Sequence, residues 1–143
     1  MAWSKTDLIP QSEIKDKVTE VTVKFAERFG NYLGTNDCKT IIDKKTGKEK
    51  EITESAKLTT TQLRKFFGEV KRQQMQGYNE TEFILLKPKL AYAVGRVGDR
   101  KAKINDFYYV ISDAMSHVKD NDSFHRFIQV FEAIVAYHKA AEV

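Results

Sequence analysis

The chain has 143 residues, a formal net charge of +4, 41% hydrophobic residues and 31% charged residues. These values fit one globular domain and exclude a disordered chain. The sequence also contains no apolar run of the ~18 residues that a membrane-spanning helix needs. Because the first residues lack an apolar signal segment and Cys38 is the single cysteine, we expect a cytoplasmic protein without an internal disulfide or a cysteine-based zinc site.

The first predicted helix covers residues 12–33. Ser12 is the expected N-cap, apolar residues recur at spacings of three and four, and Gly34 marks the end. The residues from there to about 54 have no helical period. Within them, KKTGKEKE predicts an exposed basic turn, which fits a hairpin between the short runs TII and EIT. Its Gly-Lys pair lacks the other residues of a phosphate-binding loop.

The second predicted helix lies between Thr59 and Gly77. Thr59 and Gln62 fit a capping box, and Gly77 is a natural C-terminal stop. On a helical wheel one side is apolar, which is typical of any surface helix. The other side carries four cations: Arg64, Lys65, Lys71 and Arg72. Glu69 is the sole acid of this helix, whereas a merely solvated face usually mixes both signs.

The third predicted helix covers about residues 80–97, and Pro88 should either kink it or mark a break after a short first segment. A basic stripe with one aromatic ring follows its apolar face at spacings of three and four, and consists of Lys89, Tyr92, Arg96 and Arg100. A half-buried tyrosine with a surface hydroxyl is the ordinary interpretation of Tyr92. We expect this stripe to continue the basic side of the second helix.

Two more helices complete the predicted fold. The fourth covers roughly residues 105–118, and the last begins at a cap formed by Asp122 or Ser123 and continues to about residue 141. Its broad apolar face includes His138, which we interpret as a satisfied core histidine. The sequence thus predicts an all-α, compact bundle of about five helices in a single domain, residues 1–143. Residues 1–54 form its N-terminal helix and basic hairpin-like loop, and residues 55–141 its helical core.

Charge is concentrated in the middle of the chain. Residues 1–56 are neutral, residues 57–103 carry +7, and residues 104–143 carry −3. Such a one-sided field suits phosphate, because cations replace the counterions of a nucleic acid and an aromatic ring can stack on a base. A solvated basic face without a partner is the alternative. The candidate RNA-binding residues are Arg64, Lys65, Lys71, Arg72, Lys89, Tyr92, Arg96 and Arg100.

Residue patterns for catalysis are missing from the sequence. The three histidines, His117, His125 and His138, have no metal-binding spacing, and the carboxylates are spread rather than clustered as a two-metal nuclease requires. No nucleophile lies in a recognised signature. We therefore expect no catalytic residue, no metal ligand and no cofactor.

Three segments together resemble the small helical subunit of the type III-A CRISPR effector, the Csm complex: LTTTQLRKFF, KPKLAYAVGR and FIQVFEAIVAYHK. The resemblance covers about residues 55–141. It implies a non-catalytic subunit that supports guide RNA and its paired target RNA through backbone contacts in antiviral defence. It also implies partners, namely the other subunits and further stacked copies of the chain. By position, the family's arginines correspond to Arg64 and Arg96.

Two other functions remain open from the sequence. A helical protein–protein adaptor would use the basic middle of the chain against acidic protein surfaces, and its binding would survive nuclease treatment. An enzyme with an unrecognised site would need a cleft with perturbed titratable groups.

Overall fold

The computed structural model describes residues 3–142, so residues 1, 2 and 143 of the predicted domain lie outside the described residues. Its elements in chain order are α1 (Gln11–Lys15), α2 (Glu20–Leu33), β1 (Asp37–Ile42), β2 (Glu49–Ser55), α3 (Thr60–Gln76), α4 (Glu80–Ile84), α5 (Leu86–Val97), α6 (Ile104–Met115) and α7 (Asn121–Ala141). None of the helices in residues 3–142 is long and apolar enough to cross a bilayer.

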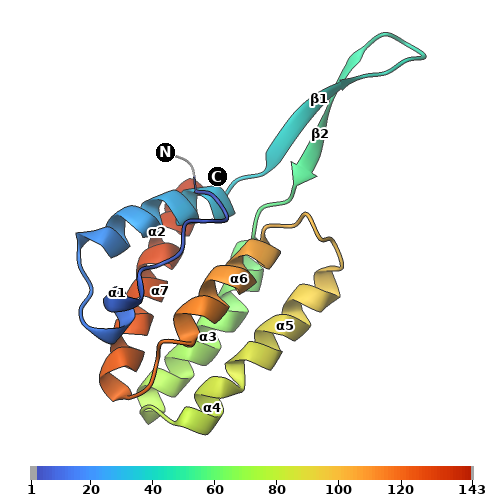
Figure 1. Ribbon diagram of the computed structural model, residues 1–143. Helices are drawn as coiled ribbons and strands as arrows, with labels where there is room; N and C mark the ends of the chain where they lie inside the picture. The colour runs from blue at the N-terminus through green and yellow to red at the C-terminus, as the bar shows by residue number, and fades with distance from the viewer. Residues whose placement is uncertain (1–2, 143) are drawn as a thin grey trace.

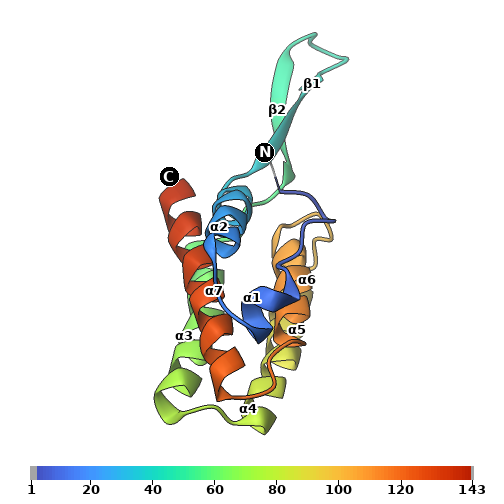
Figure 2. The same cartoon turned by 60° about the vertical axis from the view of Figure 1, so that its left-hand side comes forward.

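The helices form one body, and a β-hairpin projects from one end of it (Figure 1). The longest helix, α7, packs along α2 and α1 and also contacts α3 (Figure 2). α5 packs beside α6 and α3. The sequence periodicity predicted this mainly helical, single body correctly.

A continuous aromatic core joins the helices. Phe131 of α7 contacts Phe66 of α3 and Phe107 of α6, with ring centroids 5.5 and 5.7 Å apart. All three rings are buried. Since full burial of one such side chain contributes about 1.5–3 kcal/mol, this cluster is a main source of the fold's stability. Because α3, α6 and α7 all supply rings to it, their relative positions are fixed.

α2 and α7 approach each other most closely at Gly30. A Cβ built on Gly30 would lie 2.7 Å from the Cβ of Tyr137 and 2.8 Å from the backbone N of His138. Both distances are shorter than a normal contact, so the interface requires a residue without a side chain at this position. The side chain of His138 is buried as predicted, and its Nε2 lies 2.6 Å from the carbonyl oxygen of Leu58.

The prediction of one helix over residues 12–33 was wrong. Ser12 lies within α1, the chain leaves the helix after Lys15, and α2 begins after its N-cap, Thr19. The cause is Glu13, whose carboxylate accepts hydrogen bonds from the backbone N and Oγ1 of both Thr19 and Thr22, at 2.7–3.0 Å. Burial raises the pKa of Glu13, but these hydrogen bonds outweigh it and hold the pKa below its usual value.

Helix ends elsewhere were predicted with mixed success. The capping box of Thr59 and Gln62 is present, and α3 ends before Gly77, whose φ is 93°. The third predicted helix is broken at Leu85 into α4 and α5, with Pro88 in the first turn of α5, where it needs no amide hydrogen. The fourth helix is shorter than predicted and ends at Met115.

The predicted cap of the last helix, Asp122 or Ser123, was wrong. Asp120 caps α7, and Ser123 is its capping-box partner. Asp120 Oδ1 accepts a 2.8 Å hydrogen bond from the Ser123 amide. The cap therefore lies two residues before the first candidate cap, and the helix starts at Asn121.

The fold class all-α requires a correction, because β1 and β2 form a two-stranded antiparallel sheet. The hairpin lies where TII and EIT predicted it, and Gly47, with φ of 68°, closes its turn. Every residue of β1 is exposed. The pairing therefore depends on backbone hydrogen bonds and β-branched residues such as Ile41 and Ile42 instead of a buried face.

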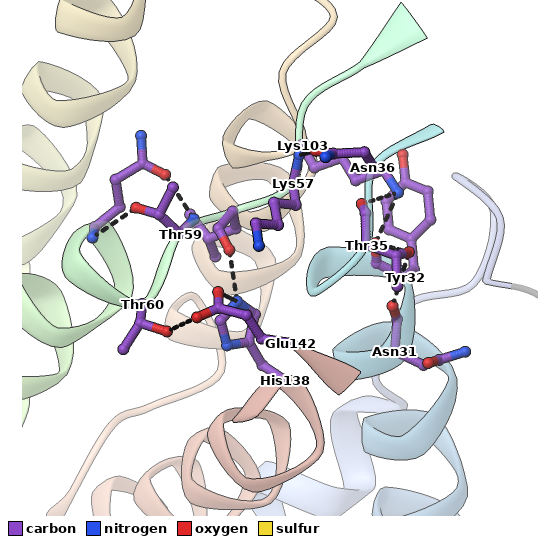
Figure 3. Close-up of polar contacts among 12 residues, drawn as sticks. Asn31, Tyr32, Thr35, Asn36, Lys57, Thr59, Thr60, Lys103, His138 and Glu142 are labelled. Carbon is purple, nitrogen blue, oxygen red and sulfur yellow. Dashed lines mark hydrogen bonds and ion pairs between the residues drawn. The ribbon is translucent and has the colours of Figure 1, made fainter. Parts of the chain in front are cut away.

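A buried lysine attaches the hairpin to the body (Figure 3). The side chain of Lys103 is fully buried, and its Nζ donates to the carbonyl oxygens of Tyr32 and Thr35, at 2.8 and 2.7 Å, and to Asp37 Oδ1 at 2.9 Å. The same ammonium lies 4.0 Å from the centroid of the Tyr32 ring. A cation here satisfies carbonyl groups at the C-terminal end of α2, where the helix dipole favours positive charge.

Candidate nucleic-acid interface

α3 and α5 flank a groove of about 500 Å³, hereafter the α3–α5 groove. Its apolar lining comes from α3, α5, α6 and the segment before α3, and comprises Leu58, Phe66, Leu90, Ala93, Val97, Ile104 and Phe107. Its polar lining comprises Thr61, Gln62, Lys65, Glu69, Lys89, Tyr92 and Arg96. The groove therefore combines an apolar surface with three cations and a single carboxylate.

The structure brings four of the predicted RNA-binding residues to this groove. Lys65 comes from α3, and Lys89, Tyr92 and Arg96 come from α5. Tyr92 is 69% exposed, and the guanidinium carbon of Arg96 lies 6.0 Å from the centroid of its ring. Within residues 3–142, neither Lys65 nor Arg96 has an acidic partner within ion-pair distance. These two charges are available to an anionic ligand.

Glu69 links the two helices that form the groove. Its Oε1 lies 2.9 Å from Nζ of Lys89 on α5 and 2.5 Å from Nη2 of Arg72 on α3. Hydrogen bonds from Arg72 and then Lys89 lower the pKa of Glu69 to about 2. The carboxylate is thus ionised at neutral pH and neutralises part of the charge of both cations.

The remaining predicted cations lie outside the groove. Lys71 faces α7, where its Nζ is paired with Glu132 and lies 5.5 Å from the centroid of the Phe67 ring. Arg64 is exposed on α3, and Arg100 is exposed in the loop between α5 and α6. The helical wheel put all four cations of α3 on one basic face, and packing against α7 and α5 divides them.

Two features of the site were missed by sequence reasoning. Thr61 and Gln62 line the groove, although Gln62 was recognised as a capping residue alone. Lys103 was counted with the basic middle segment, but it is buried at the hairpin base. A lysine five residues beyond Gly98 carries no sequence signal that distinguishes a buried anchor from a surface charge.

The polar side chains of the groove are mainly hydrogen-bond donors. Its cations and amide groups donate hydrogen bonds, and its carboxylate is occupied by Arg72 and Lys89. Among residues 3–142, no group of three or more His, Cys, Asp and Glu side chains is placed to hold a metal ion. Fold and groove together define a small, mainly helical protein with an apolar groove edged by cations.

Comparison with known families identifies the chain more closely. The model of the family described as Csm2 Type III-A matches residues 35–143, so the chain belongs to the Csm2 family of type III-A CRISPR systems. It is therefore a subunit of the multi-subunit Csm effector complex. The resemblance predicted from residues 55–141 is confirmed, and the match begins earlier, so that it includes the hairpin. No curated protein and no solved structure matches the chain.

Proposed function

We propose that this chain is a non-catalytic RNA-binding subunit of the cytoplasmic Csm complex, which supports guide RNA and its paired target RNA through backbone contacts in antiviral defence. The observation that carries the proposal is the pair of cations, Lys65 and Arg96, on the two sides of the α3–α5 groove. Both lack an ion-pair partner among residues 3–142. Tyr92, an exposed aromatic ring, lines the same groove and lies next to Arg96.

Phosphate binding fits these residues because each cation that contacts a phosphate releases condensed counterions, whatever the base sequence. Phosphate contacts position a nucleic acid without reading it, which suits a subunit that has to accept any guide. Tyr92 can add stacking on a base or packing against a ribose. The Glu69–Lys89 ion pair links α3 and α5 at the groove that holds the two cations.

Affinity of one copy for RNA is expected to be low, because few unpaired cations line the groove. Further copies stacked along the same RNA, together with the other subunits, would share the binding energy through their high effective concentration. The assembled complex is therefore the appropriate sample for the test.

The test is the double variant Lys65→Ala with Arg96→Ala, assembled into the complex and titrated with guide–target RNA at several salt concentrations. Loss of two phosphate contacts should weaken binding and flatten the plot of log K against log salt by about 1.4–1.8 units. A second double variant, Arg64→Ala with Arg100→Ala, changes two exposed cations outside the groove. Weaker RNA binding by this variant would indicate that the RNA also contacts the surface beyond the groove. A charge-matched control is Lys17→Ala with Lys139→Ala, far from the groove in sequence and exposed. A groove variant that matches this control in affinity and slope would refute the proposal.

The apolar floor of the groove favours a second candidate, an adaptor that binds an acidic segment of another protein with an apolar side chain in the groove. Ala93, which is exposed, and Val97, which is half-buried, provide apolar surface for such a side chain. Co-purification of the other subunits after nuclease treatment, together with its loss in the groove double variant, would select the adaptor. Loss of RNA affinity with assembly intact would select the RNA-binding function.

A further inference from the structure

The β-hairpin separates its charges onto two faces. Residues opposite each other in the antiparallel register share a face, and neighbours along a strand alternate between faces. The pairs Lys39–Ile52 and Ile41–Lys50 therefore form one face, hereafter the lysine face. The pairs Cys38–Thr53, Thr40–Glu51 and Ile42–Glu49 form the other. The connecting turn adds Lys44, Lys45 and Lys48 at the tip.

Four of the five acidic residues of the hairpin lie away from the lysine face, and the fifth, Glu54, lies near the base. Asp37 is paired with Lys103 at the base, and Asp43 accepts a 2.8 Å hydrogen bond from the Lys45 amide within the turn. Glu49 and Glu51 lie on the face opposite the lysine face. None of the five hairpin lysines forms an ion pair with any residue in the range 3–142. The hairpin is neutral in sum, but its lysines are concentrated on the lysine face and at the tip, where Asp43 is the one acid; Glu54 lies at the irregular pairing near the base.

The base of the hairpin is held in a fixed direction next to other basic residues. Lys103 ties Asp37 to the end of α2, and the Lys103 amide donates a 2.9 Å hydrogen bond to the carbonyl oxygen of Ala56. The loop between α5 and α6, which ends at this contact, carries exposed Arg100 and Lys101. Figure 1 shows the two strands extending from this point beyond the helices.

The composition of the hairpin distinguishes between a protein and a nucleic-acid partner. Protein interfaces depend on aromatic and arginine anchors and are depleted in lysine and glutamate. Residues 37–55 contain no Phe, Tyr, Trp or Arg, but five lysines. A lysine ammonium is a point charge on a flexible stem, so it can meet a phosphate without a fixed geometry. The exposed charge therefore complements a phosphate backbone better than a protein surface.

We propose that the hairpin is a second RNA-binding element, in which the lysine face and the tip contact backbone phosphates beyond the reach of the α3–α5 groove. The proposal rests on the RNA-binding function proposed above and adds a separate site to it. Because the strands lie outside the core, changes in their lysines should leave the helical body folded. The element should act on any RNA sequence, since it offers charges and no base-reading groups.

Two hairpin variants test this site in the assembled complex: Lys39→Gln with Lys50→Gln for the face, and Lys44→Gln with Lys45→Gln for the tip. The charge-matched control is Lys17→Gln with Lys139→Gln. We expect each hairpin pair to weaken guide–target RNA binding and to flatten the salt slope by about 0.7–1.8 units, while the control keeps the slope of the unmodified complex. Glu49→Gln with Glu51→Gln, on the opposite face, should not weaken binding.

The groove variant Lys65→Ala with Arg96→Ala is measured in parallel to separate the two proposals. If the groove variant loses affinity and both hairpin variants equal the control, the hairpin proposal is wrong and its lysines protect the exposed strand edges from pairing with other chains. If the hairpin variants lose a neighbouring subunit from the complex while RNA affinity per complex is unchanged, the partner is a protein and the proposal is also wrong. If groove and hairpin variants all equal the control, both proposals fail.

Discussion

Replacing Gly30 by alanine should destabilise the protein, because the added methyl group meets the backbone of α7. Its distances of 2.7 Å to Tyr137 Cβ and 2.8 Å to His138 N are both below those of real Cβ contacts. Relief requires α2 and α7 to separate along an interface that buries Phe29 and Ile134. Overpacking of this kind costs about 1–3 kcal/mol. Alanine gains up to ~1 kcal/mol over glycine within a helix, which offsets part of that cost.

Gly68→Ala is the matched control, because Gly68 is also helical and its Cβ would have no neighbour within 4 Å. It should stabilise the protein by about 0.5–1 kcal/mol. The helix gain occurs in both variants, so the difference between them measures the clash alone. Urea unfolding followed by circular dichroism gives both free energies, and the melting temperatures should differ by about 2–4 °C per kcal/mol. If Gly30→Ala were as stable as Gly68→Ala, the close α2–α7 contact would be wrong.

Three further predictions concern the anchor, the groove and catalysis. Lys103→Met should lower the free energy of unfolding by about 2–4 kcal/mol in urea titrations, since two carbonyl groups and Asp37 lose their donor; an unchanged value would contradict the anchor. Glu69→Gln should tighten RNA binding by releasing Arg72 and Lys89. The pKa of Glu69 is about 2 in the folded protein, compared with an ordinary value of 4.5. The ionised carboxylate therefore contributes its full stabilisation above pH 4.5 and loses it as the pH falls towards 2. The difference in the free energy of unfolding between the unmodified protein and Glu69→Gln should shrink over that pH range. The purified chain should leave single-stranded RNA and DNA intact with or without divalent metal, and cleavage that one carboxylate substitution abolishes would refute a non-catalytic role.

Local signals explain what the sequence predicted well. The capping box of Thr59 and Gln62 and the stop at Gly77 depend on residues within one turn of each other, so they can be read directly. The apolar periodicity located the cores of the helices, and the buried state of His138 followed from its place on an apolar face. The family resemblance depended on the order of three helical segments, which the matching family model confirms.

Contacts between distant segments explain what the sequence could not predict. The break before α2 depends on Glu13 reaching Thr22, and no periodicity reveals a carboxylate that folds back as a cap. Lys71 turns away from the predicted basic face because it pairs with Glu132 of α7. The two residues are 61 positions apart, so the sequence pattern of α3 does not reveal this pairing. Glu69 was recognised as the sole acid of its helix, but its pairing with Lys89 depends on how α3 and α5 pack.

The predicted all-α class did not include the strands of the hairpin, for a different reason. Its strands have no buried face, so the alternation of apolar and polar residues that usually indicates a strand is weak. The turn signal around Gly47 was clear, and the paired runs TII and EIT were visible. The sequence therefore predicted the turn, but it did not predict how long the two strands are.

The most direct test of RNA binding at the α3–α5 groove is photo-crosslinking of the assembled Csm complex that carries a guide RNA substituted with a photoreactive nucleotide, followed by mapping of the crosslinked peptides. We predict crosslinks to this chain at the α3–α5 groove, with Tyr92 as the main aromatic acceptor, and their loss in Lys65→Ala with Arg96→Ala. Crosslinks that avoid α3 and α5 while other parts of the chain or complex are labelled, or that persist unchanged in the double variant, would contradict it.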